Sequence, residues 1–526
     1  MTQNVNQVRS KPFSPNGRSR VWIWVALCSL LIIAAGGTAA FVGLSGNFSL
    51  FSPQNEIVGN GAGRIIKVPP GGSIQSALEQ ANSGDIIELR AGATYFGPIK
   101  LPNKPLTDFV TIRSSAAADL AEDKRVGPEN AASMAKILAR GKDASAVSAE
   151  NGAHHYRFIG IEFSASGSDY VYNLVLFGNG EPAAKLPHDL EIDRSYLHPN
   201  ATDMIRRGIA VNSGNTTIKN SYIEGFAFPD QETQGICGWT GTRNVHIINN
   251  YIEGGAENIM FGGSDPATAD LIPSDIEVRG NHLNKPQKWV GKASMKTLFE
   301  LKDAKRVQFT GNLMTNNWLG AAFRITVRND SGSAPFSTVE DVVIRDNVIK
   351  NAGDGINILG NDDIHPSQTL KNLIIENNLL LNISATNGFE GSGYLIQIAD
   401  GSDITIANNT AFNTGNIITF YGTRPRNFVF RDNIAGHGNY GVHGLDDIKG
   451  PAARAMIRNN LFLNLNRIPS GDYSFPPGNS TVQSVGDVGF VNAGGNDYRL
   501  SPSSKFRGKG SGGKNIGSDL PPMSPM

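Results

Sequence analysis

The chain has 526 residues, with 47 Lys and Arg balancing 47 Asp and Glu, so its formal net charge is zero and no global field attracts nucleic acid. Its two cysteines, Cys28 and Cys237, are too far apart in the chain to suggest a disulfide framework, and no cysteine and histidine motif suggests structural zinc. With 60 glycines, 8% aromatic residues and 18% charged residues, the composition favours a turn-rich β protein over a helical one.

The N-terminal region carries a membrane or export signal. Residues 1–20 are basic, and residues 21–44 form an uncharged apolar run. About 20 apolar residues span a bilayer, so we expect a transmembrane signal anchor with a cytoplasmic tail and the body outside the cytoplasm. The alternative is a cleaved signal peptide, with small residues at 38–40 as the cleavage region and a secreted body. Residues 45–60 are interpreted as a linker.

The body begins with a strand, a short helix and a second strand across residues 65–100. Helical spacing relates four apolar residues, Ile74, Ala77, Leu78 and Ala81. The Gly84-Asp85 pair ends this helical segment. A solenoid needs its terminal edge covered, so this helix is predicted to cap the N-terminal end of a stack.

A short repeat then dominates the sequence up to residue 500. Alternating apolar residues followed by Asn recur about eleven times from Ile161 onward, at spacings of about 24 to 35 residues. The recurring residues are Ser195 and Ser221 and then Asn250, Asn281, Asn312, Asn347, Asn378, Asn409, Asn433 and Asn460. Such a strand buries its apolar face only when coils stack, so residues 61–500 are predicted to form an all-β solenoid. The Asn amides are expected to stack as a structural ladder. Residues 501–526, rich in Pro, Ser and Gly, are predicted to be irregular.

The start of the body resembles that of a known superfamily. The stretches Pro70–Leu78, Gly84–Ile87 and Gly92–Tyr95, together with the Asn-bearing repeats, are similar to the pectate-lyase-like right-handed parallel β-helix proteins. The resemblance implies a right-handed parallel β-helix of about eleven coils, with the N-terminal capping helix, preceded by the one apolar helix. This fold hosts lyases, hydrolases, epimerases, esterases and adhesins, so function has to come from individual residues.

A second strand precedes each Asn strand and predicts a polar row. If Phe299 and Leu301 point inward, their neighbours point outward. Adjacent coils lie about 4.8 Å apart, so outward residues of successive coils should line up. The predicted row is Glu300, Lys302, Arg324, Arg328, Asn357, Gln397 and Tyr421.

This row fits β-elimination on an acidic polysaccharide. Lys302 is the candidate base, and Arg324 and Arg328 are candidates to bind the uronate carboxylate or stabilise the enolate. The segments Glu300-Leu301-Lys302-Asp303 and Arg328-Asn329 resemble the alginate lyase and chondroitinase B family, which implies Lys and Arg acting from nearby coils. The alternative is an ion-pair ladder between coils without catalytic function.

Other residues are candidates for sugar and metal contacts. Trp289 lies in an insertion at 282–297 together with Lys285, Lys288 and Lys292, which suits stacking on an acidic sugar, although it could equally anchor the loop. Asn357, Gln397 and Tyr421 complete the candidate substrate contacts. Carboxylates are the ligands that calcium prefers, and the candidates are Glu257, Glu300 and Asp303. No motif for an organic cofactor or a nucleotide is present.

The sequence therefore predicts an extracytoplasmic, monomeric polysaccharide-binding protein, with a lyase preferred. One rival is a glycoside hydrolase that uses Asp354 and the Asp362-Asp363 pair, with His437 in a later Gly-His-Gly. The other rival is a non-catalytic adhesion or carbohydrate-binding solenoid.

Overall fold

The computed structural model describes residues 54–522 except 62, 168, 202, 387, 439, 445–455 and 464–477. The predicted basic tail, the apolar segment and most of the linker lie outside the described residues. Within the described part of the chain, no helix is long and apolar enough to cross a membrane. The described residues all belong to the unit that begins at residue 51.

The first of two large sheets, here the ladder sheet, has 15 strands. Its strands, in spatial order, are β1 (Glu56–Val58), β2 (Ile65–Val68), β3 (Ile86–Leu89), β6 (Val110–Ser114), β9 (His154–Ile159), β12 (His188–Asp193), β15 (Gly214–Lys219), β18 (Arg243–Ile248), β21 (Ser274–Arg279), β24 (Ala304–Thr310), β26 (Val339–Arg345), β28 (Lys371–Glu376), β31 (Ser402–Ala407), β34 (Arg426–Arg431) and β37 (Ile457–Arg458). Only β1 pairs antiparallel, and the remaining neighbours are parallel.

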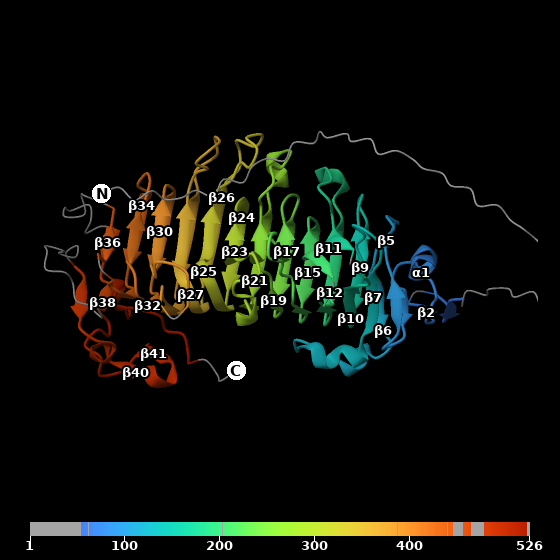
Figure 1. Ribbon diagram of the computed structural model, residues 1–526, viewed down its shortest axis with the longest axis horizontal. Coiled ribbons are helices and arrows are strands. Elements are labelled where there is room, and N and C mark those ends of the chain that lie inside the picture. Colours follow the sequence, from blue (N-terminus) through green and yellow to red (C-terminus); the bar gives the residue numbers. More distant parts are fainter. Residues whose placement is uncertain are drawn as a thin grey trace, which may run out of the picture. The chain divides into compact units, whose positions relative to one another are not determined.

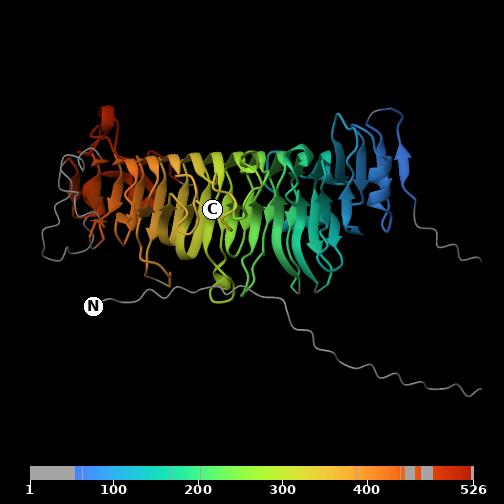
Figure 2. The same cartoon turned by 90° about the horizontal axis from the view of Figure 1, so that it is seen from above.

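The second sheet, here the site sheet, has 24 strands and contains the outward-facing polar residues. Its strands are β4 (Thr94–Phe96), β5 (Ile99–Leu101), β7 (Ala135–Ala139), β8 (Val147–Ala149), β10 (Ile161–Ala165), β11 (Tyr170–Phe177), β13 (Tyr196–Leu197), β14 (Met204–Val211), β16 (Tyr222–Ile223), β17 (Gln234–Gly238), β19 (Tyr251–Glu253), β20 (Glu257–Phe261), β22 (His282–Asn284), β23 (Thr297–Leu301), β25 (Leu313–Thr326), β27 (Val348–Leu359), β29 (Leu379–Ile383), β30 (Ile396–Ala399), β32 (Thr410–Asn413), β33 (Ile418–Phe420), β35 (Ile434–Gly436), β36 (Val442–His443), β38 (Leu461–Leu463) and β39 (Ser480–Val482). Figures 1 and 2 show the strands of successive coils side by side along the stack.

Helices are few and short. The α-helix α1 (Ile74–Gln80) lies beside β2 at the N-terminal end of the stack (Figure 1) and buries Ile74, Ala77 and Leu78. Ser73 caps it by accepting a hydrogen bond from the backbone N–H of Ser76. The 3₁₀ helices are η1 (Ala117–Asp119), η2 (Pro128–Ser133), η3 (Ala183–Lys185), η4 (Ala269–Leu271), η5 (Gln287–Trp289), η6 (Val485–Val488), η7 (Ala493–Gly495) and η8 (Ser511–Gly513). A small antiparallel pair, β40 (Phe490–Asn492) and β41 (Asp497–Leu500), follows the stack.

The repeat corresponds to the strands of the ladder sheet from β9 to β37, and the predicted asparagine ladder is confirmed. The Asn347 side-chain oxygen accepts hydrogen bonds from the backbone N–H and the side-chain amide of Asn312, at 2.9 and 3.1 Å. The same pairing links each ladder Asn to the next, from Asn250 to Asn479. The parallel stack also continues on the N-terminal side of the repeat, through β6, β3 and β2.

The two sheets enclose an apolar core of stacked side chains. The Phe299 and Phe323 rings come from adjacent site-sheet strands, and both pack against Phe309 from the ladder sheet, at centroid distances of 4.4 and 5.1 Å. Because inward positions alternate with outward ones, packing this core turns Glu300 and Arg324 onto the outer face.

The described C-terminal residues, 501–522, contain no strand but pack against the coils. The Ser518 N–H donates to the Thr410 hydroxyl at 2.9 Å, and the Ser511 N–H donates to Asp432 at 2.9 Å. Ile516 is buried with Leu461 and Val482. Residues 501–522 thus form an irregular segment that covers the side of the last coils.

Candidate functional site

The site sheet brings the core of the predicted polar row into register. Across β23, β25, β27, β30 and β33 the paired residues are Glu300, Arg324, Asn357, Gln397 and Thr419. Lys302 directly follows β23, and Arg328 follows β25. Side-chain contacts divide this row into three parts. These are a pair of glutamates, a pocket beside Arg324, and Arg328 in an ion pair with a neighbouring loop.

The acidic pair consists of Glu257 on β20 and Glu300 on β23, from neighbouring coils. Both are buried, at 0% and 2% exposure, and one oxygen of each carboxylate has no hydrogen-bond partner among the described residues. The Lys296 ammonium lies 3.1 Å from the Glu257 carboxylate and 2.7 Å from that of Glu300. Gln234 donates a hydrogen bond of 2.8 Å to the other oxygen of Glu257.

This arrangement moves the pKa values of the two carboxyls in opposite directions. Burial raises the pKa of Glu300, and the charge of Lys296 offsets this only in part. Burial would also raise the pKa of Glu257, but the charges of Lys296 and Lys302 and the hydrogen bond from Gln234 outweigh it and leave that pKa lowered. Burial thus favours the neutral form of Glu300, whereas the nearby ammonium groups favour the charged form of Glu257.

Lys302 lies at the acidic-pair end of the row. Its side chain runs over Gly263 in the loop after β20, where an added Cβ would lie 3.1 Å from the Lys302 Cδ and 3.5 Å from its Nζ. Its charge contributes to lowering the pKa of Glu257. Lys302 is thus the second cation beside this pair.

Asp303, the third candidate calcium ligand, has partners elsewhere. Its carboxylate accepts hydrogen bonds of 3.0 Å from the Ser337 hydroxyl and from the Thr338 N–H, just before β26. Burial raises the pKa of Asp303 to about 7, and these two bonds offset part of the rise. A metal site built from these candidates therefore rests on Glu257 and Glu300.

The raised pKa of Asp303 predicts a pH-dependent stability. An unfolded Asp titrates near 3.9, so the folded chain binds more protons here between about pH 4 and 7. The Asp303 contribution should be fully present below about pH 4 and lost as the pH rises through 7. We expect Asp303→Asn, which keeps the shape of the protonated acid, to lack this component. Urea unfolding of the unchanged chain and of Asp303→Asn at a series of pH values measures this component. Free energies of unfolding that change with pH in the same way in both proteins would contradict the prediction.

The pocket lies beside Arg324 and has a volume of about 510 Å³. Asp354 on β27 and Tyr394 just before β30 line it together with Arg324, and Gln397 and Thr419 extend the lining along the row. The Nε of Arg324 is buried and has no hydrogen-bond partner among the described residues. Arg324 thus offers an uncommitted donor beside this pocket.

Asp354 and Tyr394 both have shifted pKa values. Burial raises the pKa of Asp354, although the backbone N–H groups of Ser392 and Tyr394 donate to it at 2.7 and 3.3 Å. Burial also raises the pKa of Tyr394, and the nearby Asp354 charge adds to the effect. A carboxyl with a raised pKa, a neutral phenol and a guanidinium are therefore gathered in one pocket.

Arg328 is held by the loop that follows β27. Its guanidinium forms an ion pair with Asp363 and lies 3.7 Å from Asp362. Burial would raise the pKa of Asp362, but the backbone N–H groups of Asn329, Ile364 and His365 donate to it and lower that pKa. The two aspartates considered for hydrolysis therefore close a turn, apart from Asp354 in the pocket.

The inserted loop at 282–297 is anchored rather than open. Trp289 is only 8% exposed. Lys285 is fully buried, and its ammonium donates to the backbone carbonyls of Gly254, Gly255 and Ala256. Neither side chain offers much surface to a sugar, which favours the anchoring interpretation of Trp289.

The remaining candidate contacts lie along the row. Asn357 donates a hydrogen bond of 3.0 Å to the Gln397 side chain. The Tyr421 hydroxyl donates to the carbonyl of Ile358 at 3.0 Å, while 43% of the residue stays exposed. Tyr421 thus presents an aromatic face to solvent beside the amide pair.

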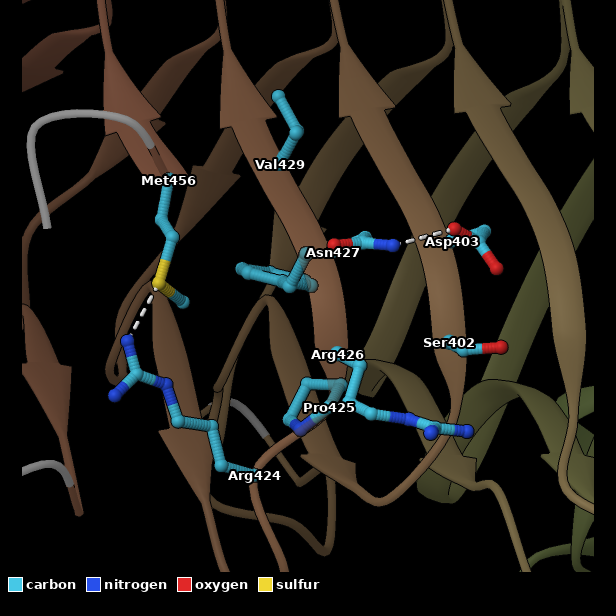
Figure 3. Close-up of a pocket in the computed structure, with 9 residues that line it drawn as sticks. Ser402, Asp403, Arg424, Pro425, Arg426, Asn427, Val429 and Met456 are labelled. Atoms are coloured by element: carbon cyan, nitrogen blue, oxygen red, sulfur yellow. Dashed lines mark hydrogen bonds between the residues drawn. The ribbon is translucent and has the colours of Figure 1, made fainter. Parts of the chain in front are cut away.

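A larger pocket of about 870 Å³ lies on the ladder sheet, around Arg424 and Arg426. Figure 3 shows the Arg424 side chain directed at the sulfur of Met456 and the Asn427 amide bonded to Asp403. Its charged side chains are exposed, and it contains none of the predicted site residues. The smaller pocket is therefore the candidate site, because it gathers the buried Asp354 with the half-buried Arg324 and Tyr394.

Sequence reasoning missed Lys296 and Tyr394. Lys296 lies four residues before Glu300, a spacing that has no meaning in a strand. Tyr394 lies in the insertion at 379–394, whose path the repeat does not determine. Neither carried a motif that could have identified it.

Comparisons with known proteins support the fold. The model of the NosD family, described as a periplasmic copper-binding protein, matches residues 272–471. The structure of the PL6 family alginate lyase AlyGC matches 88% of this chain at 16% identity with a TM-score of 0.53. The catalytic unit of a GH87 α-1,3-glucanase from Streptomyces thermodiastaticus strain HF3-3 matches 74% of this chain and 70% of its own, at 14% identity and a TM-score of 0.43. This chain spans 57% of the length of the alginate lyase, and no curated protein matches it. At such identity the likeness concerns the fold alone.

Proposed function

The chain has the fold of the right-handed parallel β-helix proteins, and from this premise we propose that it binds an acidic polysaccharide outside the cytoplasm and cleaves it by β-elimination. The observation that carries the proposal is the pocket in which Arg324, Asp354 and Tyr394 meet. The match to a periplasmic family and the basic tail before an apolar run support the location. We further propose that the chain acts as a monomer and that residues 21–44 anchor it.

Each group in the pocket has a role in β-elimination. Arg324 binds the uronate carboxylate and stabilises the negative charge that develops on it when the adjacent C5 proton leaves. Asp354 accepts that proton, since a carboxylate with a raised pKa is a stronger base than an ordinary one. Tyr394, kept neutral by its raised pKa, donates a proton to the departing glycosidic oxygen. The C5–H and C4–O bonds break, and a C4=C5 double bond forms.

The rest of the row would bind neighbouring sugars. Asn357 and Gln397 supply amide donors, and the half-exposed ring of Tyr421 supplies a stacking surface. Lys302, at the other end, contacts a second carboxylate of the polymer and is the alternative base. Arg328, held by Asp363, shapes the adjacent loop.

We also propose a cation at the acidic pair. Glu257 and Glu300 supply the oxygen donors that calcium prefers, and the Lys296 ammonium already occupies the space between them. A calcium ion held there would add positive charge beside the polymer. The donor set therefore fits calcium only where Lys296 moves aside.

Replacing Lys296 tests this competition directly. We expect calcium to raise the thermal midpoint of Lys296→Met more than that of the unchanged chain, because the variant leaves two carboxylates without their cation. Adding Glu300→Gln to the variant should abolish the difference. A calcium response that is the same in all three proteins would contradict the proposed site.

The function itself is tested by incubating the full chain with acidic and neutral polysaccharides, with calcium or with chelator. We expect unsaturated-uronate absorbance and reducing ends to rise together on an acidic polymer. Asp354→Asn should lower turnover by about 10²- to 10⁴-fold, the usual contribution of a general base, whereas Lys302→Met should mainly raise KM.

Other outcomes would overturn parts of the proposal. Turnover that survives Asp354→Asn but not Lys302→Met would make Lys302 the base. Reducing ends without absorbance would indicate hydrolysis. Saturable binding without product would leave a carbohydrate-binding solenoid, the non-catalytic alternative.

A further inference from the structure

Three histidines meet on the ladder sheet, away from the polar row. His154 and His155 begin β9, and His188 begins the neighbouring strand β12, in register with His154. The rings of His154 and His188 stack with centroids 4.7 Å apart and planes 3° from parallel. The Nδ1 atoms of His154 and His155 lie 2.6 Å apart. Only one proton fits between two nitrogens at this distance, so at least one lone pair points at its neighbour.

A carboxylate completes the cluster. One oxygen of Asp189 lies 2.5 Å from the Nδ1 of His188 and 4.0 Å from that of His155. Its other oxygen accepts a hydrogen bond of 3.2 Å from the side-chain amide of Asn215. Asn215 in turn accepts one of 2.9 Å from Asn244. The side-chain amides of Asn215 and Asn244 thus orient the Asp189 carboxylate, as outer-shell partners do at metal sites.

The fold does not require histidine at position 155. His155 has a left-handed backbone, with φ of 60°. Among the other ladder-sheet strands, β24 places Arg306 with a left-handed backbone at the same position, and eight strands place Asp or Asn there. These residues are Asp189, Asn215, Asn244, Asp275, Asp341, Asn372, Asp403 and Asn427. An Asn or Asp at position 155 would continue this row of equivalent positions. His155 instead directs its Nδ1 at the Nδ1 of His154.

We propose that His154, His155 and His188, together with Asp189, bind one divalent transition-metal ion of the zinc or copper kind. Imidazole is the ligand that suits these ions. They hold nitrogen ligands at about 2.0 to 2.1 Å, so two ligands of one ion lie at most about 4.2 Å apart. The three imidazoles offer donor atoms that all lie within 4.8 Å of one another.

Small side-chain rotations close the remaining gap. The side chains of His155 and His188 are 23% and 43% exposed, so they can turn, and an ion can enter from solvent. The bound ion would replace the proton between His154 and His155 and link the coils of β9 and β12. Among the described residues this is the one group of three such ligands, and it lies outside the segment 272–471 that matches the copper-binding family.

The test is a titration of the full chain with Cu²⁺ and, separately, with Zn²⁺, followed by calorimetry. We expect one equivalent per chain, a higher thermal midpoint with metal, and nitrogen hyperfine structure in the Cu²⁺ electron paramagnetic resonance spectrum. The ion that binds more tightly in these two titrations, Cu²⁺ or Zn²⁺, is the preferred one.

His155→Asn is the decisive variant, because it restores a residue type that this row of equivalent positions carries elsewhere and should preserve the fold. It should weaken binding at least tenfold, because losing even an outer-shell partner of a metal ligand weakens metal binding by about 10- to 100-fold. His246→Ala is the matched control, since His246 lies on the same sheet, paired with Glu277 at 2.8 Å. Binding of less than one equivalent, or equal affinity in the two variants, would overturn the site.

Discussion

Replacing Arg324 with methionine should lower turnover on an acidic polysaccharide by about 10²- to 10³-fold, the usual cost of removing one preorganised donor. The thermal midpoint should stay nearly unchanged, because the Arg324 Nε has no partner whose loss would leave a buried group unpaired. Steady-state kinetics by unsaturated-uronate absorbance, with thermal unfolding of the same samples, measures both effects.

Arg328→Met is the matched control for this prediction. Arg328 is also an arginine of the predicted row, just after β25, but it is paired with Asp363. Its side chain is 30% exposed, so the loss should cost no more than about 1 kcal/mol of stability and change turnover only a few-fold. If Arg328→Met lost turnover and Arg324→Met kept it, the reaction would take place at the loop and not in the pocket.

Replacing Asn347 with alanine should lower the free energy of unfolding by about 3 to 5 kcal/mol, since several buried groups each lose a bond worth about 1 to 3 kcal/mol. Asn347 donates to the Phe309 carbonyl at 3.0 Å and accepts two bonds from Asn312. All of these groups are buried between coils, where water cannot replace the lost partner.

Asn103→Ala serves as the control for the ladder variant. Asn103 is exposed and makes one side-chain bond, of 2.9 Å, to the carbonyl of Asn151. Its replacement should cost less than about 1 kcal/mol. Urea unfolding of both variants measures the difference, and similar losses would mean that the ladder adds little beyond ordinary hydrogen bonds.

The fold was predictable because a solenoid repeats one physical requirement. Each coil must bury the same alternating face and pair the same corner amide, so the pattern around Asn250 recurs up to Asn460. The register of Glu300, Arg324, Asn357 and Gln397 followed from the same alternation. Residues governed by the repeat were therefore placed correctly on one face.

The parts of the site that lie outside the repeat were not predictable. Lys285 has the sequence context of a basic surface loop, yet it is buried against the carbonyls that follow β19. Tyr394 and Lys296 reach the site from insertions whose course depends on tertiary packing. The histidine cluster combines residues one coil apart, so His188 shows no local spacing to His154 in the sequence.

The most direct test of the central claim is a crystal structure of Asp354→Asn soaked with an acidic oligosaccharide. We predict a uronate carboxylate hydrogen-bonded to Arg324 at about 3 Å, with the sugar chain following Asn357 and Gln397 along the site sheet. An oligosaccharide bound instead at Arg424 and Arg426 on the ladder sheet, or a pocket that stays empty while the polymer binds in solution, would contradict it.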